Sequence, residues 1–361
     1  MPTDLGFKPF EAKGELKGQR ALFRDCFPET IGRHAERDAH YFWKFHGFPA
    51  QPPSYEYGAY LGEELIGYYA AIPYKYQVGG RILTAAMVCD VMTGSRARGK
   101  GVFTRLGAYS LDQMKLAGLD FTTGYPIRPE VLPGHLKVGW KVVQKMPIYV
   151  KVLRSNAILR NKKLGFLSFL GNAGAAVFNL IPALKPAGKE HMLEILSVDG
   201  ILNDSTYPPF LQKWMKGVPN ALVKDRDFLK WRLGAPETQY QVFVARNASR
   251  EIVAMCIAVN TSLEKIPSLA LLDLMILPEH RRSFRLLDPA LRQFALRSGS
   301  EIIAAMMHTR WAQEYGLGSM GYLKSPFVFS LIVKKLNDTL ADSSLYEIDR
   351  WHTMWIDSDD L

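Results

Sequence analysis

The sequence predicts an α/β protein made of two copies of one module. Three observations support this prediction: a run of strand-like segments from Tyr55 to Met92, a glycine-rich loop and helix that follow it, and a second half that repeats the same order. The chain has 361 residues, of which 48% are apolar, so it is long enough to give two modules a hydrophobic core each.

The elements of the first half follow from local patterns. The segments YEYGAYL, ELIGYYAAI, KYQV and RILTAAMVCDVM have the composition of strands, and the Gly-Gly pair at 79–80 predicts a hairpin turn. Apolar residues then recur at helical spacing from Val102 to Leu116, and Gly118 marks the end of this helix. We expect a short strand in DFTTGYP, a short helix that ends at the Gly-Trp pair 139–140, and a closing pair of strands in KVVQKMPIYVKVL.

The second half repeats this order. The segment WKFHGFP precedes the first set of strands, and WRLGAP precedes YQVFVAR and EIVAMCIAV. Asp90-Val-Met is echoed by Asp273-Leu-Met, and the Gly-Trp pair by Gly-Tyr at 321–322. We therefore predict an N-terminal module over 1–152, a linker over 153–218 and a C-terminal module over 219–361.

The predicted linker contains LGFLSFLGNAGAAVFNLIPAL, residues 164–184, which has no charged side chain. Its length permits a membrane span, but Asn172, Asn179 and Pro182 disfavour one. The basic residues that flank it suit a helix at a bilayer surface. We expect a helix buried between the modules, with peripheral membrane contact as the second interpretation and a span as a distant third.

Composition excludes several classes of protein. The formal net charge of +10 indicates an anionic partner, but zinc-finger spacing, an RNP-like motif and a long basic run are all missing, which disfavours nucleic acid. Phosphate on a small ligand fits at least as well. Three widely spaced cysteines encode neither a disulfide framework nor a CxxC metal site, so no metal is expected. The N-terminus lacks the order of a secretory signal, which predicts a cytoplasmic protein, and the oligomeric state is not encoded.

The stretch SRARGKGVF, residues 95–103, is the strongest functional motif. A strand that leads through a glycine-rich loop into a helix aims unpaired backbone N–H groups at one point, where anions bind. Gly99 and Gly101 allow close approach, and Arg96, Arg98 and Lys100 add positive charge. The spacing is neither a P-loop nor a dinucleotide-binding fingerprint. It suits a pyrophosphate, although many such loops are only turns.

The spacing Arg96-x-x-Gly99-x-Gly101 resembles the acyl-CoA motif [Q/R]xxGx[G/A] of the GNAT acetyltransferase superfamily. The order of elements resembles the GNAT fold from about Phe7 to Val152, so the resemblance implies two tandem GNAT-like modules, each a mixed, mostly antiparallel central sheet flanked by helices. In the second copy RARGKG aligns with EHRRSF, where Arg282 and Phe284 replace the glycines, and we expect no CoA there.

The resemblance also implies a reaction. Acyl-CoA would be the co-substrate, and a primary amine would attack its thioester directly, with general acid and base help. Tandem GNATs associated with bacterial surface-polysaccharide biosynthesis are similar, which makes a nucleotide-linked amino sugar one candidate acceptor. The residues implied for the pantetheine arm and the pyrophosphate are Val91, Met92, Thr93, Arg96, Arg98, Gly99, Lys100, Gly101, Val102 and Phe103.

Catalytic residues are predicted less specifically. GNAT enzymes often carry a tyrosine four residues before the Gly-aromatic pair. His135 stands there and is the candidate general acid or base, with a surface histidine that happens to fall at this position as an equal alternative. Tyr125 is the fallback proton donor. Asp90 would orient the amine or take its proton through water, although its repetition as Asp273 favours a structural role.

Two further readings stay open. The first is a Fem-like transferase, which is also built from paired GNAT modules and takes an aminoacyl-tRNA as donor. It would explain the positive charge, but it would give the RxxGxG loop no function. A non-catalytic CoA- or peptide-binding protein is the other alternative.

The C-terminal WHTMWIDSDDL combines aromatic and acidic residues that suit an acceptor site, although charged tails are usually solvated.

Overall fold

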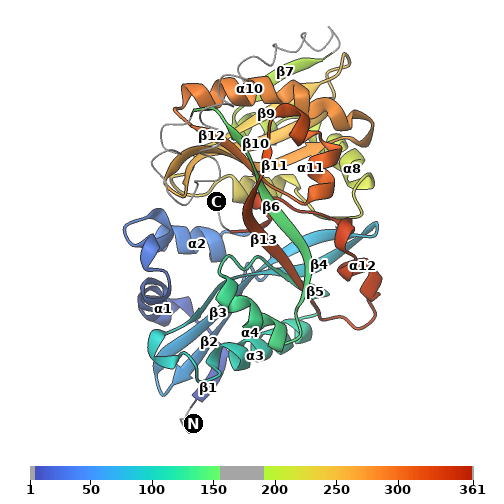
Figure 1. Cartoon of the computed structure of the whole chain (residues 1–361). Helices are drawn as coiled ribbons and strands as arrows, with labels where there is room; N and C mark the ends of the chain where they lie inside the picture. Colours follow the sequence, from blue (N-terminus) through green and yellow to red (C-terminus); the bar gives the residue numbers. More distant parts are fainter. Residues whose placement is uncertain (1–4, 155–190, 360–361) are drawn as a thin grey trace.

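The computed structural model describes residues 5–154 and 191–359 (Figure 1). In this part of the chain the strands of both halves join one sheet of 14 strands, which is mostly antiparallel and flanked by helices. The predicted mixed, mostly antiparallel α/β architecture is therefore confirmed. The apolar segment 164–184 lies outside the described residues.

The first half follows the predicted order closely. The hairpin of β3 and β4 turns at the predicted Gly-Gly pair, and α3 covers the residues that the apolar spacing indicated. Its elements are β1 (Leu5–Pro9), α1 (Ala12–Cys26), η1 (Pro28–Thr30), η2 (His34–Glu36), α2 (Asp38–His46), β2 (Tyr55–Leu61), β3 (Glu64–Val78), β4 (Arg81–Thr93), η3 (Ser95–Ala97), α3 (Val102–Leu116), β5 (Phe121–Gly124), η4 (Pro129–Val131), α4 (Leu132–Lys137) and β6 (Lys141–Val152).

The second half repeats the order of the first-half strands and adds two short ones, Asn220–Leu222 and Trp351–His352. Residues 192–218, which the sequence assigned to the linker, form β7, α7 and α8, and β7 pairs with β9. The elements are β7 (Met192–Leu196), α7 (Val198–Leu202), α8 (Tyr207–Lys216), β8 (Asn220–Leu222), α9 (Arg226–Arg232), β9 (Tyr240–Arg246), β10 (Ile252–Leu263), β11 (Ile266–Ile276), η6 (Pro278–Ser283), α10 (Phe284–Arg297), β12 (Ile302–Met306), α11 (Thr309–Glu314), η7 (Leu317–Met320), β13 (Leu323–Lys335), α12 (Asp342–Tyr346), η8 (Ile348–Arg350), β14 (Trp351–His352) and η9 (Trp355–Asp357).

The two halves exchange a strand. The order across the sheet is β1-β2-β3-β4-β5-β13-β6-β12-β11-β10-β9-β7, so the last strand of each half lies beside the fifth-strand position of the other. Each of these strands has a counterpart in the other half, for example β1 and β7, or β6 and β13. When counterparts are exchanged, the order from β7 to β1 becomes the order from β1 to β7. In Figure 1, β6 and β13 cross between the lower and upper halves. The expectation that KVVQKMPIYVKVL forms two strands was wrong: it lies in the single strand β6, which is needed at full length because it pairs with both β12 and β13.

Tryptophans of the two WK and WR segments join the halves. The indoles of Trp43 and Trp231 stack with centroids 5.2 Å apart and planes 11° apart. Trp43 Nε1 donates to the Trp231 carbonyl at 2.7 Å, and Trp231 Nε1 donates to the Trp43 carbonyl at 2.9 Å. The two segments therefore make the same contact in both directions.

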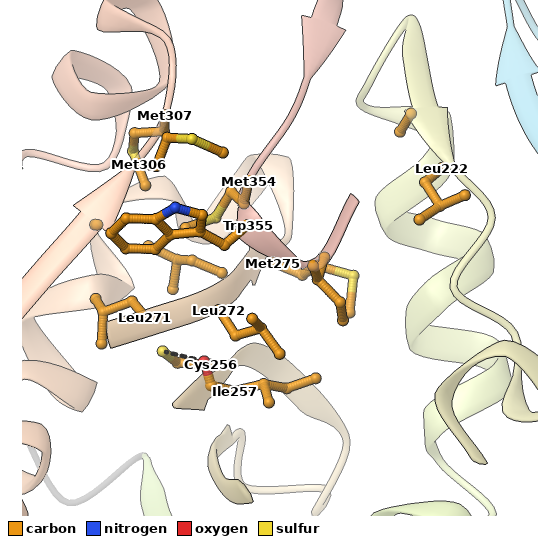
Figure 2. Packing of buried hydrophobic residues seen from close by; sticks show 14 of the residues in the cluster. Leu222, Cys256, Ile257, Leu271, Leu272, Met275, Met306, Met307, Met354 and Trp355 are labelled. Carbon is orange, nitrogen blue, oxygen red and sulfur yellow. Dashed lines mark hydrogen bonds between the residues drawn. The ribbon is translucent and has the colours of Figure 1, made fainter. Parts of the chain in front are cut away.

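The C-terminal segment, residues 351–359, is built into the core from residue 351 to residue 358, and Asp359 follows at the surface. Trp351, Met354, Trp355 and Ile356 are at most 1% exposed. Figure 2 shows the Trp355 indole among Met306, Met307, Leu271 and Met354. No helix among residues 5–154 and 191–359 has both the length and the apolar character that a membrane crossing needs.

Candidate functional site

The first-half sheet opens beside the end of β4. In the parallel pairing of β4 with β5, Ala85–Val88 face Phe121–Gly124, and in the described part of the chain the rest of β4 has no strand on that side. The last residues of β4 therefore have no strand partner along one edge, although the Thr93 carbonyl accepts from Arg98 Nε and Cys26 Sγ. An extended ligand can add to such an edge as a further strand.

A β-bulge lies in this unpaired stretch. Across the pairing of β3 and β4, Ala70 faces Cys89 and Tyr68 faces Met92, so Asp90 and Val91 share one opposing residue. Asp90 has φ of 46°, a left-handed conformation that few side chains other than Asn and Asp adopt readily. β10 and β11 of the second half also lose register, next to Asp273. A bulge changes the direction in which nearby side chains point, and bulges often border active sites.

The loop after β4 has the geometry of an anion cradle. Gly99 and Gly101 have φ of 75° and 73°, and a Cβ on Gly99 would meet nothing within 4 Å. α3 starts at Val102 without a capping side chain, and its first bond runs from the N–H of Arg105 to the Gly101 carbonyl. The amides of residues 102–104 thus stay available at the positive end of the helix.

Neighbouring groups fix the loop and give it charge. The Asp25 carboxylate accepts the Ser95 N–H at 2.7 Å, and Arg98 Nε donates to the Thr93 carbonyl at 3.3 Å. Arg96, Arg98 and Lys100 are exposed. The loop is therefore held in place while its cationic side chains face solvent.

The corresponding place in the second half has no such cradle. There η6 runs directly into α10, and Ser283, the residue before α10, has φ of −74°. Phe284 is fully buried, with its ring 5.6 Å from that of Tyr322. Neither left-handed glycines nor an open helix start is present at residues 278–284.

His135 lies behind the first turn of α3. Its ring packs edge-on against Phe103 and Trp140, with centroids 5.1 and 5.3 Å away. Its Nδ1 has no hydrogen-bond partner among the described residues, and burial lowers its pKa to about 4. The imidazole is therefore neutral at pH 7, and a pKa this low makes it a weak acceptor for an ammonium proton.

Tyr125 follows β5 at the mouth of the opening. It is buried and hydrogen-bonded to Tyr76, and burial raises its pKa well above the usual value. The Tyr76 hydroxyl also lies 3.0 Å from Thr123 Oγ1. Tyr125 thus keeps its proton at neutral pH, and its raised pKa makes it a weaker acid than an exposed tyrosine.

Asp90 belongs to a buried ion cluster that sequence reasoning missed. Lys44 Nζ of α2 lies 2.9 Å from Asp90 Oδ1 and 2.6 Å from Asp359 Oδ2. Burial opposes the charge on Lys44, but the two carboxylates prevail and raise its pKa. In the sequence Lys44 is only a basic residue beside Trp43, and nothing local indicated that Asp359 would meet it.

The predicted residues fall into two groups. Val91, Met92 and Thr93 continue directly into the glycine loop, so all the residues predicted to bind CoA form one continuous path. Asp90 begins this path, whereas His135 and Tyr125 lie on separate elements beside it. No group of three or more His, Cys, Asp or Glu side chains within 5–154 and 191–359 is arranged to hold a metal ion.

Comparison with known proteins relates the first half to a known domain and the whole chain to known folds. Residues 11–143 match the family model described as an acetyltransferase (GNAT) domain. A search of curated proteins finds no match. A GCN5-related N-acetyltransferase from Anabaena variabilis is similar in structure, with a TM-score of 0.63 and 12% identity over 92% of this chain and 73% of the other.

Two other solved structures are similar over nearly the whole chain. An Enterococcus faecalis protein of unknown function, described as a probable N-acyltransferase, has a TM-score of 0.67 and 10% identity over 93% of this chain and 73% of the other. The Saccharomyces cerevisiae N-myristoyltransferase with bound myristoyl-CoA has a TM-score of 0.60 and 11% identity over 93% and 80%. At these identities the likeness concerns the fold, and this chain has a GNAT-like fold.

Proposed function

We propose that this protein is an acyl-CoA-dependent N-acyltransferase. The first half would bind acyl-CoA, and a primary amine would attack the thioester beside the end of β4. The acyl group moves from the CoA sulfur to the amine nitrogen, so a C–N bond forms, the C–S bond breaks, the amine loses a proton and the thiolate gains one.

The observation that carries this proposal is the continuous path from the bulge of β4 to the start of α3. Backbone groups of Val91, Met92 and Thr93 would pair with the pantetheine arm like an added strand. Amides around Gly99, Gly101 and Phe103 would bind the diphosphate, and exposed basic side chains would add attraction. The absence of this cradle at residues 278–284 supports a single CoA site per chain.

The proton donor is assigned from its position and protonation state. Tyr125 borders the opening and carries its proton at neutral pH, so it is the proposed donor to the departing thiolate, and water takes the proton that the amine loses. His135 is the weaker candidate because its imidazole is buried and neutral, and we assign it to packing behind α3. The acceptor we propose is a small amine, with a nucleotide-linked amino sugar as one candidate because its phosphates suit the positive charge.

Ligand-induced stabilisation tests the proposal. A ligand that binds only the folded state raises the unfolding temperature. Acetyl-CoA should therefore raise it, and thiol should be released when an acceptor amine is added. Stabilisation by RNA but not by CoA would favour an aminoacyl-tRNA-dependent transferase. CoA binding without thiol release over a panel of amines would favour a non-catalytic binder.

A further inference from the structure

Lys44 joins parts of the chain that are far apart in sequence. Its ammonium contacts Asp90 of β4 and Asp359 of the C-terminal segment, which are 46 and 315 residues away. The Lys44 side chain is 7% exposed, that of Asp90 11% and that of Asp359 26%. Asp359 is therefore the most accessible carboxylate of the cluster.

The second half fixes the segment that carries Asp359. Trp351 Nε1 donates to the Leu345 carbonyl, and the Trp351 carbonyl accepts from Trp311 Nε1, both at 2.8 Å. Trp355 is buried against β11 and β12 (Figure 2), and Asp357 Oδ2 accepts the Met354 N–H at 2.7 Å. The Trp351 ring also contacts Tyr76 and Phe121 of the first half, with centroids 5.8 and 6.0 Å away. Beyond this anchor the chain continues to Asp359, which contacts Lys44.

The ion cluster lies where the proposed reaction takes place. Asp90 is part of the bulge at the free edge of β4, and the predicted pantetheine contacts begin at the next residue. A buried ammonium is strongly unfavourable without partners, so it orders the carboxylates that neutralise it. The Asp359 carboxylate is thus held at the bulge.

We propose that Lys44 is a positioning residue of the acyl-transfer site: it holds the Asp359 carboxylate beside the bulge of β4, where Asp359 binds the ammonium form of the acceptor amine. The bound ammonium loses one proton to water, and the neutral nitrogen then attacks the thioester. This inference rests on the proposed function. The acceptor side of the site is then made by both halves of the chain, which gives the second half a role although it lacks a CoA cradle. Lys44 acts through Asp359 and takes no proton.

A double-mutant cycle tests this inference. The full chain is assayed for thiol release from acetyl-CoA with glucosamine, spermidine and lysine methyl ester, and the best of these amines is used for wild type, Lys44→Met, Asp359→Asn and the double variant. Each single change should raise KM for the amine about tenfold or more, as expected for a lost hydrogen bond to a charged group. The double variant should match the single variants, because both changes remove one interaction. KM for acetyl-CoA should stay within about twofold, because the CoA contacts lie elsewhere.

Lys151→Met is the matched control. Lys151 and Asp288 form a similarly buried ion pair at 2.6 Å, with side chains 13% and 12% exposed, away from the C-terminal segment. This control should lower the unfolding temperature and leave KM for the amine unchanged. If Lys44→Met does not fold, Asp359→Asn decides alone, because it keeps the pair between Lys44 and Asp90.

The outcomes separate this inference from the proposed function. An active wild type with unchanged KM for the amine in Asp359→Asn, or with additive effects in the double variant, overturns the role of Lys44 only. A wild type that binds acetyl-CoA but releases no thiol with any of the three amines overturns the proposed transferase and this inference together.

Discussion

Replacing Gly99 by alanine tests the anion cradle with a matched control in the same region. Gly99 has φ of 75° and Gly118, at the other end of α3, has φ of 82°; a Cβ on either would meet nothing within 4 Å. Alanine in this left-handed conformation costs roughly 1–2 kcal/mol at both positions. The Gly99→Ala and Gly118→Ala variants should therefore lose similar stability.

Their affinities for CoA should differ. Only the new methyl group at Gly99 stands where the diphosphate would approach the backbone. Loss of one hydrogen bond to a charged group costs about 1.5–3 kcal/mol, which raises Kd roughly 10- to 150-fold. We expect this increase in Gly99→Ala and an unchanged Kd in Gly118→Ala.

Urea unfolding and isothermal titration with CoA measure the two effects separately. Stability losses that agree between the variants, with a CoA defect confined to Gly99→Ala, support the cradle. Wild-type affinity in Gly99→Ala would refute it. An equal loss of affinity in Gly118→Ala would show that the defect comes from strain in α3 and not from the loop.

Three further predictions concern stability and charge. Because the pKa of His135 is about 4 in the folded chain and near 6.5 when unfolded, the unfolded chain alone gains this proton as pH falls from 6.5 to 4. The wild type should therefore lose stability over that window, and His135→Phe should lose less, by on the order of 3 kcal/mol in the free energy of unfolding. Urea titrations at several pH values measure this difference. The same pH dependence in both proteins would contradict a buried, neutral His135. Trp43→Phe should destabilise by about 1 kcal/mol, because the Trp231 carbonyl loses its donor while the ring stack remains; a neutral effect by the same method would count against the reciprocal contact. Added salt should weaken CoA binding, and it should weaken binding less in Lys100→Gln, because that variant has one positive charge fewer. Titrations at two ionic strengths measure this effect. If the Kd of the variant and of the wild type depended equally on salt, Lys100 would not contribute to the diphosphate site.

The local parts of the candidate site were readable from the sequence. Glycines at 99 and 101 indicated left-handed backbone, and both have positive φ. The apolar spacing from Val102 to Leu116 predicted a helix with the same bounds as α3. These features depend on neighbours within a few residues, so a short stretch of sequence contains all the necessary information.

The non-local parts could not be read in this way. The alternating pattern of β6 is the same whichever strand it pairs with, so the exchange with β13 leaves no local trace. The acidic end of the chain looked like a solvated tail, yet Trp351 and Trp355 are buried and bring Asp359 to Lys44. Two tryptophans so close to the end were the available signal. Similarly, the position of His135 was predicted, but its packing between Phe103 and Trp140 depends on three separate elements.

A crystal structure with acetyl-CoA bound would show whether the first half holds the coenzyme. We expect one molecule per chain, with its diphosphate on the amides of residues 99–103 and its pantetheine arm along Val91–Thr93. A diphosphate bound at residues 278–284, or a first-half loop that makes no contact with the bound nucleotide, would contradict this expectation.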